Sequence, residues 1–231
     1  MERDEGESVT FHNREEAGRW LVEQLLHYRE RPATLILALP RGGMAVGYQL
    51  SLGLHLPLEV FIVRKLGAPG NPEYALGAVC ERGPVYLNPE ASAAFRLSEA
   101  DIKKLVRTQE KEIVRHQALY RQDRQLPALT GRTVILVDDG IATGSTFFAS
   151  VQSIRELKPH RLIGAIPVGP IETIREVRTL VDELVVLATP NPFWAVGNHY
   201  VDFAQVSDRA VVEYLNLAEE ALREHAQPSS A

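Results

Sequence analysis

The chain of 231 residues has little of several features that would assign it to other classes of protein. Cys80 is its single cysteine, so neither an intrachain disulfide nor a cysteine metal cage can form. No apolar run approaches the length of a membrane span, and the acidic stretch MERDEGESVT lacks the apolar segment of a signal peptide. Basic residues are not in excess, since the formal net charge is −5. We therefore expect a cytoplasmic protein without a membrane partner and without general affinity for nucleic acid.

The motifs of the commonest phosphate-binding and hydrolytic sites are also missing. The sequence contains neither G-x-x-x-x-G-K-[ST] nor G-x-G-x-x-G, which excludes the usual P-loop and dinucleotide-binding sites. It contains neither H-E-x-x-H nor G-x-S-x-G, which excludes the commonest zinc-protease and serine-hydrolase sites. A phosphate site in this chain must therefore be built in another way.

The apolar pattern predicts an α/β fold. Hydrophobic residues make up 45% of the chain, and several short runs are apolar on both faces, as in the interior strands of a parallel sheet. Helical patterns lie between most of these runs, and this alternation predicts an open, mainly parallel sheet flanked by helices. The predicted strands are residues 34–39, 58–63, 133–137, 162–168 and 184–188, and the predicted helices are residues 13–29, 43–52, 145–157, 171–180 and 208–225.

We divide the chain into an α/β core at residues 1–189 and a C-terminal segment with a last helix at residues 190–231. The core carries an insertion at about residues 81–129, where the strand rhythm stops. Within it, residues 84–87 resemble a short edge strand, and residues 98–120 predict a long helix that opens with a Ser98–Asp101 capping box. Acids and bases are mixed along this helix, which favours a solvated face over nucleic-acid binding.

Two of the predicted strands are followed by cationic or glycine-rich loops. In an open α/β sheet, ligands bind beyond the carboxyl ends of the strands. Arg41 and the glycine pair that follows it can hold an anion with a guanidinium and with backbone N–H groups. Arg64 and Lys65 precede a Gly/Pro-rich loop at residues 66–74, which we expect to be mobile. Taken singly, either loop also fits a plain surface turn.

The stretch LVDDGIATGST at residues 136–146 is more specific. Asp138 and Asp139 stand at the end of a strand, where two carboxylates repel each other unless hydroxyl groups or a metal ion relieve them. Thr143, Ser145 and Thr146 then place hydroxyl groups at a helix N-terminus, which is typical of a phosphomonoester site. The alternative is an Asp-rich turn followed by a helix cap, but turn chemistry needs neither two acids nor so many hydroxyl groups.

A strand, two aspartates, small residues and Thr-Gly-x-Thr together resemble the signature for 5-phospho-ribose 1-diphosphate (PRPP) in type I phosphoribosyltransferases. PRGG resembles the pyrophosphate loop of that family, and RKLGAPGNPEYALGAV occupies the place of its flexible catalytic loop. The similarity covers about residues 34–80 and 130–205. It is strongest to a bacterial subgroup with the patterns LPRGG, VRKLGAPGNPE and VDDGxATG.

The resemblance implies a transferase (a glycosyltransferase of the pentosyl class) that moves the phosphoribosyl group of PRPP to a nitrogenous acceptor and releases pyrophosphate. It implies catalytic roles for Arg41, Lys65, Asp138 and Asp139. It also implies Mg²⁺, held mainly by substrate and water near the two aspartates. The implied PRPP-binding residues are Arg41, Gly42, Gly43, Arg64, Lys65, Asp138, Asp139, Gly140, Ile141, Ala142, Thr143, Gly144, Ser145 and Thr146, and the implied base-binding residues are Phe193, Trp194, Val196 and Asp202.

Several alternatives stay open at this point. Ala142 stands where members of the family that use 6-oxopurines often carry an aspartate as general base, so the implied acceptor is not a 6-oxopurine. Phe193 and Trp194 fit a stacked base as well as an anchor for an irregular segment. A non-catalytic regulator that binds PRPP or a nucleotide, and a hydrolase of phosphoribosyl compounds, are the alternative functions. A homodimer through residues 98–120 is also left open.

Overall fold

The computed structural model describes residues 9–82, 85–88, 91, 94–95, 97–122 and 124–226, without the side chains of residues 72, 73 and 75. Its centre is a five-stranded sheet in the order β2-β1-β6-β7-β8, in which all neighbouring strands are parallel. This sheet confirms the predicted α/β class. The strands are β1 (Thr34–Ala38), β2 (Leu58–Val60), β6 (Thr133–Val137), β7 (Arg161–Val168) and β8 (Glu183–Ala188).

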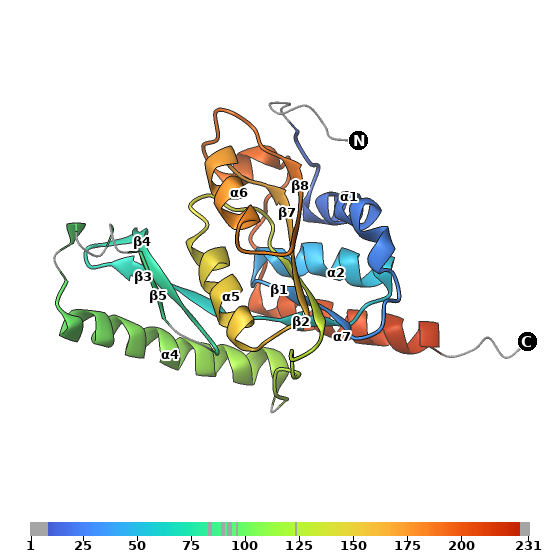
Figure 1. Cartoon of the computed structure of the whole chain (residues 1–231), viewed down its shortest axis with the longest axis horizontal. Coiled ribbons are helices and arrows are strands. Elements are labelled where there is room, and N and C mark those ends of the chain that lie inside the picture. The colour runs from blue at the N-terminus through green and yellow to red at the C-terminus, as the bar shows by residue number, and fades with distance from the viewer. Residues whose placement is uncertain are drawn as a thin grey trace, which may run out of the picture.

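Helices cover both faces of this sheet (Figure 1). Ile36 and Ala38 of β1 belong to a core cluster shared with α1, α2 and α7, whereas Leu35 and Leu37 belong to a second cluster shared with α5 and α6. Because successive side chains of a strand point to opposite faces, burial of both faces explains why the strands are apolar throughout. The helices are α1 (Arg14–Leu25), α2 (Gly42–Leu54), α5 (Ser145–Glu156), α6 (Ile171–Arg178) and α7 (Asp208–Ala226), and short 3-10 turns lie at η1 (Leu26–Tyr28) and η2 (Val196–His199).

A second, antiparallel sheet and a long helix stand to one side of the core (Figure 1). The sheet contains β3 (Val63–Ala68), β4 (Asn71–Cys80) and the edge strand β5 (Tyr86–Leu87). Helix α4 (Glu99–Arg121) opens with the predicted Ser98–Asp101 capping box. Of the described helices, none is long and apolar enough to cross a membrane.

The predicted single strand at residues 58–63 is wrong, because the chain leaves the parallel sheet after β2 and begins β3 at Val63. The predicted mobile loop at residues 66–74 is also corrected, since most of it belongs to the β3–β4 hairpin. A run that is apolar on both faces carries no periodic signal, so it does not reveal that one strand ends and another begins inside it.

Arg121, the last residue of α4, joins the insertion to the core. It is only 2% exposed, and its Nε lies 2.9 Å from Oε2 of Glu59 in β2. The same guanidinium donates to Oε1 of Glu81, just after β4, over 2.7 Å. Burial raises the pKa of Glu59 above its ordinary value although Arg121 opposes this shift. The two carboxylates therefore depend on one buried cation.

Replacement of Arg121 with methionine is expected to lower the free energy of unfolding by about 3–5 kcal/mol, because two poorly solvated carboxylates lose their cation. Urea unfolding at pH 7.5 measures the effect. Arg107→Met, at an exposed position of the same helix, is the control and should change stability by less than about 0.5 kcal/mol. Equal stability of the two variants would refute the anchoring role of Arg121.

Candidate functional site

The loops that follow β1 and β6 leave the sheet side by side. The two strands pair in parallel, with Ala38 opposite Val137, and the N–H of Leu39 donates to the Val137 carbonyl over 2.9 Å. A Cβ added to Gly42 would lie 1.8 Å from Oδ2 of Asp139. The PRGG loop therefore contacts the aspartate pair, and only glycine allows so close an approach at this position.

Asp139 is held by Arg14, a buried residue in the first turn of α1. Its Nε donates to Oδ2 of Asp139 over 2.7 Å. The guanidinium also donates to the Ala204 carbonyl over 2.8 Å and stacks on the Phe203 ring at 3.8 Å from the ring centroid. Sequence reasoning missed Arg14. Its position three residues before Ala17, on the buried stripe of the opening helix, was the available signal.

Of the two aspartates, Asp138 is the one whose ionised form is destabilised. Its Oδ1 accepts the backbone N–H of Asp139 over 2.9 Å. Burial and the adjacent Asp139 carboxylate raise the pKa of Asp138 well above its ordinary value. A ligand that brings hydroxyl donors or positive charge would remove this penalty, because both stabilise the ionised form of a carboxyl group.

The C-terminal segment closes over the aspartates. A Cβ on Gly140, whose φ is 153°, would lie 2.5 Å from Cγ1 of Val196, so this segment packs on the loop itself. The hydroxyl of Tyr200 donates to the Asp139 carbonyl over 2.5 Å. Burial, followed by the charge of Asp139, raises the pKa of Tyr200, so this hydroxyl keeps its proton. Tyr200 is not among the residues that the sequence predicted for the site.

Residues 142–146 form a turn at the start of α5. Gly144 is the N-cap with a φ of 72°, and an added Cβ would lie 2.6 Å from Phe148. The Thr173 hydroxyl of α6 donates to the Ala142 carbonyl over 2.9 Å and thereby braces the turn. The first N–H groups of an α-helix have no intrahelical acceptor, and the helix dipole is positive there, so the turn is suited to an anion.

Arg64 and Lys65 lie within β3 and not in a loop beyond the parallel sheet. The Nε of Arg64 donates to Oε1 of Gln109 in α4 over 3.3 Å. Adjacent strand residues point to opposite faces, so Lys65 projects from the other face of the hairpin. The small sheet thus directs Arg64 toward α4 and separates the two cations that the sequence analysis grouped.

A pocket of 170 Å³ lies behind the PRGG loop, between the core and α4. Asp208, at the start of α7, accepts the Tyr120 hydroxyl over 2.6 Å and lies 3.9 Å from NH1 of Arg41. The insertion therefore reaches the PRGG loop through α4. The charged and polar residues that line the pocket are Arg41, Arg64, Arg115, His116, Tyr120 and Asp208.

Three of the four predicted base-binding residues, Phe193, Trp194 and Asp202, differ in their surroundings. Phe193 stacks on His199 with ring centroids 5.2 Å apart and packs on a small core cluster. Trp194 is 79% exposed. Oδ1 of Asp202 accepts the N–H of Ala204 over 3.0 Å and so serves the turn of its own segment. Of the two aromatic side chains, Trp194 is the one with an open ring face.

Asp138→Asn is expected to raise the free energy of unfolding at pH 7.5 by about 1 kcal/mol. The folded-state pKa of Asp138 is raised, so its carboxyl destabilises the fold above the unfolded pKa of about 3.9 and not below it. The gain should therefore fade as the pH falls toward 4. Urea unfolding at several pH values measures it, with the exposed Glu110→Gln as control. A gain that persists at pH 3.5 would contradict this explanation.

Known proteins are similar to this chain in sequence and in fold. Residues 10–202 match the family model described as "Phosphoribosyl transferase domain". Two proteins of Mycobacterium tuberculosis, from strains CDC 1551 / Oshkosh and ATCC 25618 / H37Rv, are 39% identical over 208 residues; their names assign them provisionally to the phosphoribosyl transferases. The match covers 90% of this chain and 47% of each relative, so the chain spans about half the length of these relatives.

A solved structure agrees with this result. The crystal structure of the protein TT1426 from Thermus thermophilus superposes with a TM-score of 0.74 at 37% sequence identity. The match covers 90% of this chain and 98% of that one. It therefore includes nearly all of the Thermus protein. The family model spans both site loops and the C-terminal segment up to residue 202. Together with the Thermus structure, this match shows that the chain belongs to the phosphoribosyl transferase family.

Proposed function

We propose that the chain binds PRPP and transfers its phosphoribosyl group to a nitrogenous acceptor, with release of pyrophosphate. The observation that carries this proposal is the contact between Gly42 and the Asp139 carboxylate. This contact places the PRGG loop, which is suited to an anion, next to Asp138 and Asp139. The N-terminus of α5, which is also suited to an anion, lies at the same end of the sheet. PRPP has the matching chemistry, since phosphates stand at both ends and hydroxyl groups in the middle.

Each part of the site has a role in this reaction. Residues 142–146 bind the 5-phosphate with N–H and hydroxyl groups. Asp138 and Asp139 accept the ribose hydroxyl groups, and the PRGG loop holds the pyrophosphate with backbone N–H groups, assisted by the charges of Arg41 and Arg64. An acceptor nitrogen then bonds to the anomeric carbon as the bond to pyrophosphate breaks. The electron pair leaves with pyrophosphate, and the proton of the acceptor nitrogen passes to solvent water.

Catalysis in this scheme rests on positioning and on charge. The anomeric carbon gains oxocarbenium character, so the aspartates next to the ribose stabilise it while the cations stabilise the leaving group. Closure of the β3–β4 hairpin over the ligand would bring Lys65 to the cations that stabilise the leaving pyrophosphate. The closed hairpin would also exclude water, which competes with the acceptor. The chain thus supplies the geometry, and the substrate supplies the reactive bond.

Magnesium fits this site as a substrate-borne ion. Oδ2 of Asp139 is engaged by Arg14 and Oδ1 of Asp138 by a backbone N–H, so the carboxylates offer few remaining ligand positions. Mg²⁺ prefers oxygen ligands and keeps several waters, which suits binding through pyrophosphate and ribose oxygens beside the two acids. When bound, the ion would neutralise charge on the departing pyrophosphate.

We propose a planar nitrogenous acceptor that is not a 6-oxopurine. Ala142 offers no carboxylate at the position from which a 6-oxopurine would be deprotonated, and it is the exposed first residue of the turn at residues 142–146. Trp194 presents an open indole face, and Val196 packs on the loop at Gly140. A heterocycle can stack on the indole while its edge bonds to backbone groups of the same segment.

The primary test is calorimetry with PRPP and Mg²⁺. Asp139→Asn should lower the affinity at least tenfold, because it weakens both the ribose contact and the bond to Arg14. Glu156→Gln, at an exposed acid on α5, should bind as the unchanged chain does. If PRPP does not bind, or if Asp139→Asn has no effect, the proposed function is wrong.

A panel of nucleobases distinguishes transfer from its alternatives. Pyrophosphate release that requires one base indicates phosphoribosyl transfer to that base. Tight binding of PRPP or a nucleotide without turnover would indicate a regulator instead. Release that needs no acceptor would indicate a hydrolase.

Trp194→Ala should weaken binding of the acceptor or the nucleotide product about tenfold, because stacking of a base on an aromatic ring contributes roughly 1–3 kcal/mol. The exposed position predicts a change in stability below about 0.5 kcal/mol. The chain has two tryptophans, so Trp20→Phe leaves Trp194 as a fluorescent reporter. Its emission should be quenched by the ligand. Unchanged emission at saturation would exclude stacking on Trp194.

A further inference from the structure

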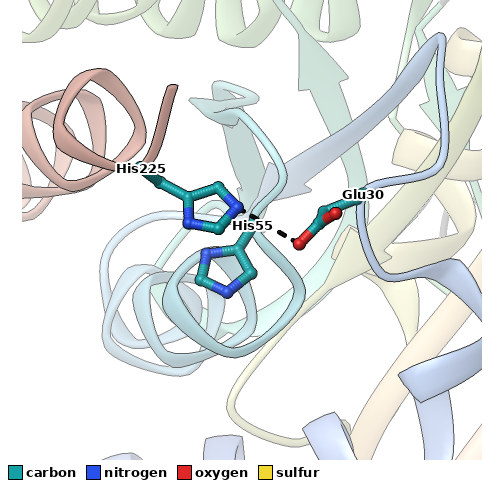
Figure 2. A group of neighbouring side chains, drawn as sticks. All are labelled: Glu30, His55 and His225. Carbon is teal, nitrogen blue, oxygen red and sulfur yellow. Dashed lines mark hydrogen bonds and ion pairs between the residues drawn. The ribbon is translucent and has the colours of Figure 1, made fainter. Parts of the chain in front are cut away.

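Three side chains capable of binding a metal meet far from the PRGG loop. Glu30 follows η1, His55 caps the C-terminus of α2, and His225 lies in the last turn of α7. One ligand atom from each lies within 4.8 Å of the others. Figure 2 shows the two imidazole rings one above the other with the Glu30 carboxylate beside them. The rings are 3.8 Å apart and nearly parallel, at 4°.

The backbone holds two of these positions together. The N–H of Glu30 donates to the carbonyl of Leu54, the residue just before His55, over 2.8 Å. Both Glu30 and His55 have left-handed backbone conformations, with φ of 54° and 51°. The two side chains therefore come from two tight turns that are bonded to each other.

The third position depends on the packing of α7 on α2. Leu50 and Leu54 of α2 share a core cluster with Val211 and Leu215 of α7. At the end of α7, Nε2 of His225 lies 3.1 Å from Oε1 of Glu30 (Figure 2). A buried helix contact and an exposed hydrogen bond thus bring His225 to the other two ligands.

We propose that Glu30, His55 and His225 form a binding site for a divalent transition metal ion, with zinc as the best match. Two imidazoles and one carboxylate with a water molecule make a common four-coordinate zinc set. The ion would take the place of the proton between His225 and Glu30. Ligand bonds of about 2.0–2.2 Å require the donor atoms to move about 1 Å closer together and the His225 ring to turn out of the stack, because an imidazole binds a metal in its own ring plane. Glu30 and His225 are exposed, so rotation about their χ angles can achieve this.

This site differs in chemistry and in place from the proposed magnesium position. Magnesium selects oxygen ligands and binds poorly to imidazole, so millimolar Mg²⁺ should not compete. Helix α2 begins at Gly42 in the PRGG loop and ends at Leu54, next to His55. The three-residue cluster therefore lies at the opposite end of α2 from the aspartate pair, where a bound ion would fasten the end of α7 to the turns at Glu30 and His55.

Arg29 supplies a sharper test of the geometry. Its NH2 lies 3.4 Å from Nε2 of His55, so a bound cation would meet this guanidinium. Arg29→Gln removes the repulsion and should tighten zinc binding severalfold. A metal held elsewhere would not respond to this substitution.

The experiment uses the full chain without a histidine tag, freed of metal by a chelator, and titrated with Zn²⁺ against a chromophoric competitor. We expect one ion per chain, with His225→Gln and His55→Gln each lowering the affinity at least tenfold. His160→Gln, at an exposed histidine outside the cluster, should leave it unchanged. At a hundredfold excess of zinc over Kd, the melting temperature should rise by roughly 5–10 °C.

Three results would overturn the proposal. They are absence of zinc binding at micromolar concentration, retention of the full affinity in both cluster variants, and loss of binding in His27→Gln, which would move the ion to the His27–Glu183 pair. Asp139→Asn is the control variant that separates the zinc site from the proposed PRPP site. It should leave zinc affinity intact, so failure of the PRPP proposal and failure of the zinc proposal are separate outcomes.

Discussion

The site depends on the need to keep two adjacent carboxylates, Asp138 and Asp139, half-buried side by side at the end of β6. Arg14 supports one of them with a 2.7 Å bond from Nε, while the other is left with a raised pKa. The same guanidinium holds the Ala204 carbonyl and the Phe203 ring, so the ion pair also docks the C-terminal segment on α1. The pair thus organises the surrounding fold, and part of its repulsion remains for a ligand to relieve.

The charges around this pair form a pattern that suits the ligand proposed above. The N-terminus of α5 is positive on one side, and the PRGG loop with the arginine-lined pocket is positive on the other. The acids lie between them, where Gly42 allows the loops to touch. A ligand with two anionic ends and a hydroxylated centre satisfies all three regions, whereas a plain phosphate satisfies one. This order of charges is a stronger argument than any single loop.

Sequence patterns predicted the elements whose formation depends on residues close together in the chain, such as strands and helix caps. The residues of β6 followed from an apolar run bounded by Arg132 and Asp138, and the capping box of α4 followed from cap chemistry. The break between β2 and β3 did not, because an apolar run buried on both faces has no period to interrupt. The role of Arg14 could not be predicted, because its partner Asp139 lies 125 positions away in the sequence. The sequence also did not distinguish Phe193 from Trp194; in the structure Phe193 packs on a core cluster and Trp194 is exposed.

The insertion and the last helix both reach the PRGG loop although they lie outside the most recognisable motifs. The family match ends at residue 202, before Asp208 begins α7. Asp208 accepts the Tyr120 hydroxyl of α4 and faces Arg41, so both additions converge behind the PRGG loop. Arg121 anchors α4 to the core, and α7 packs along α2, so both helices are fixed to the core next to this loop. Arg41 therefore lies next to Asp208, a residue outside the family match.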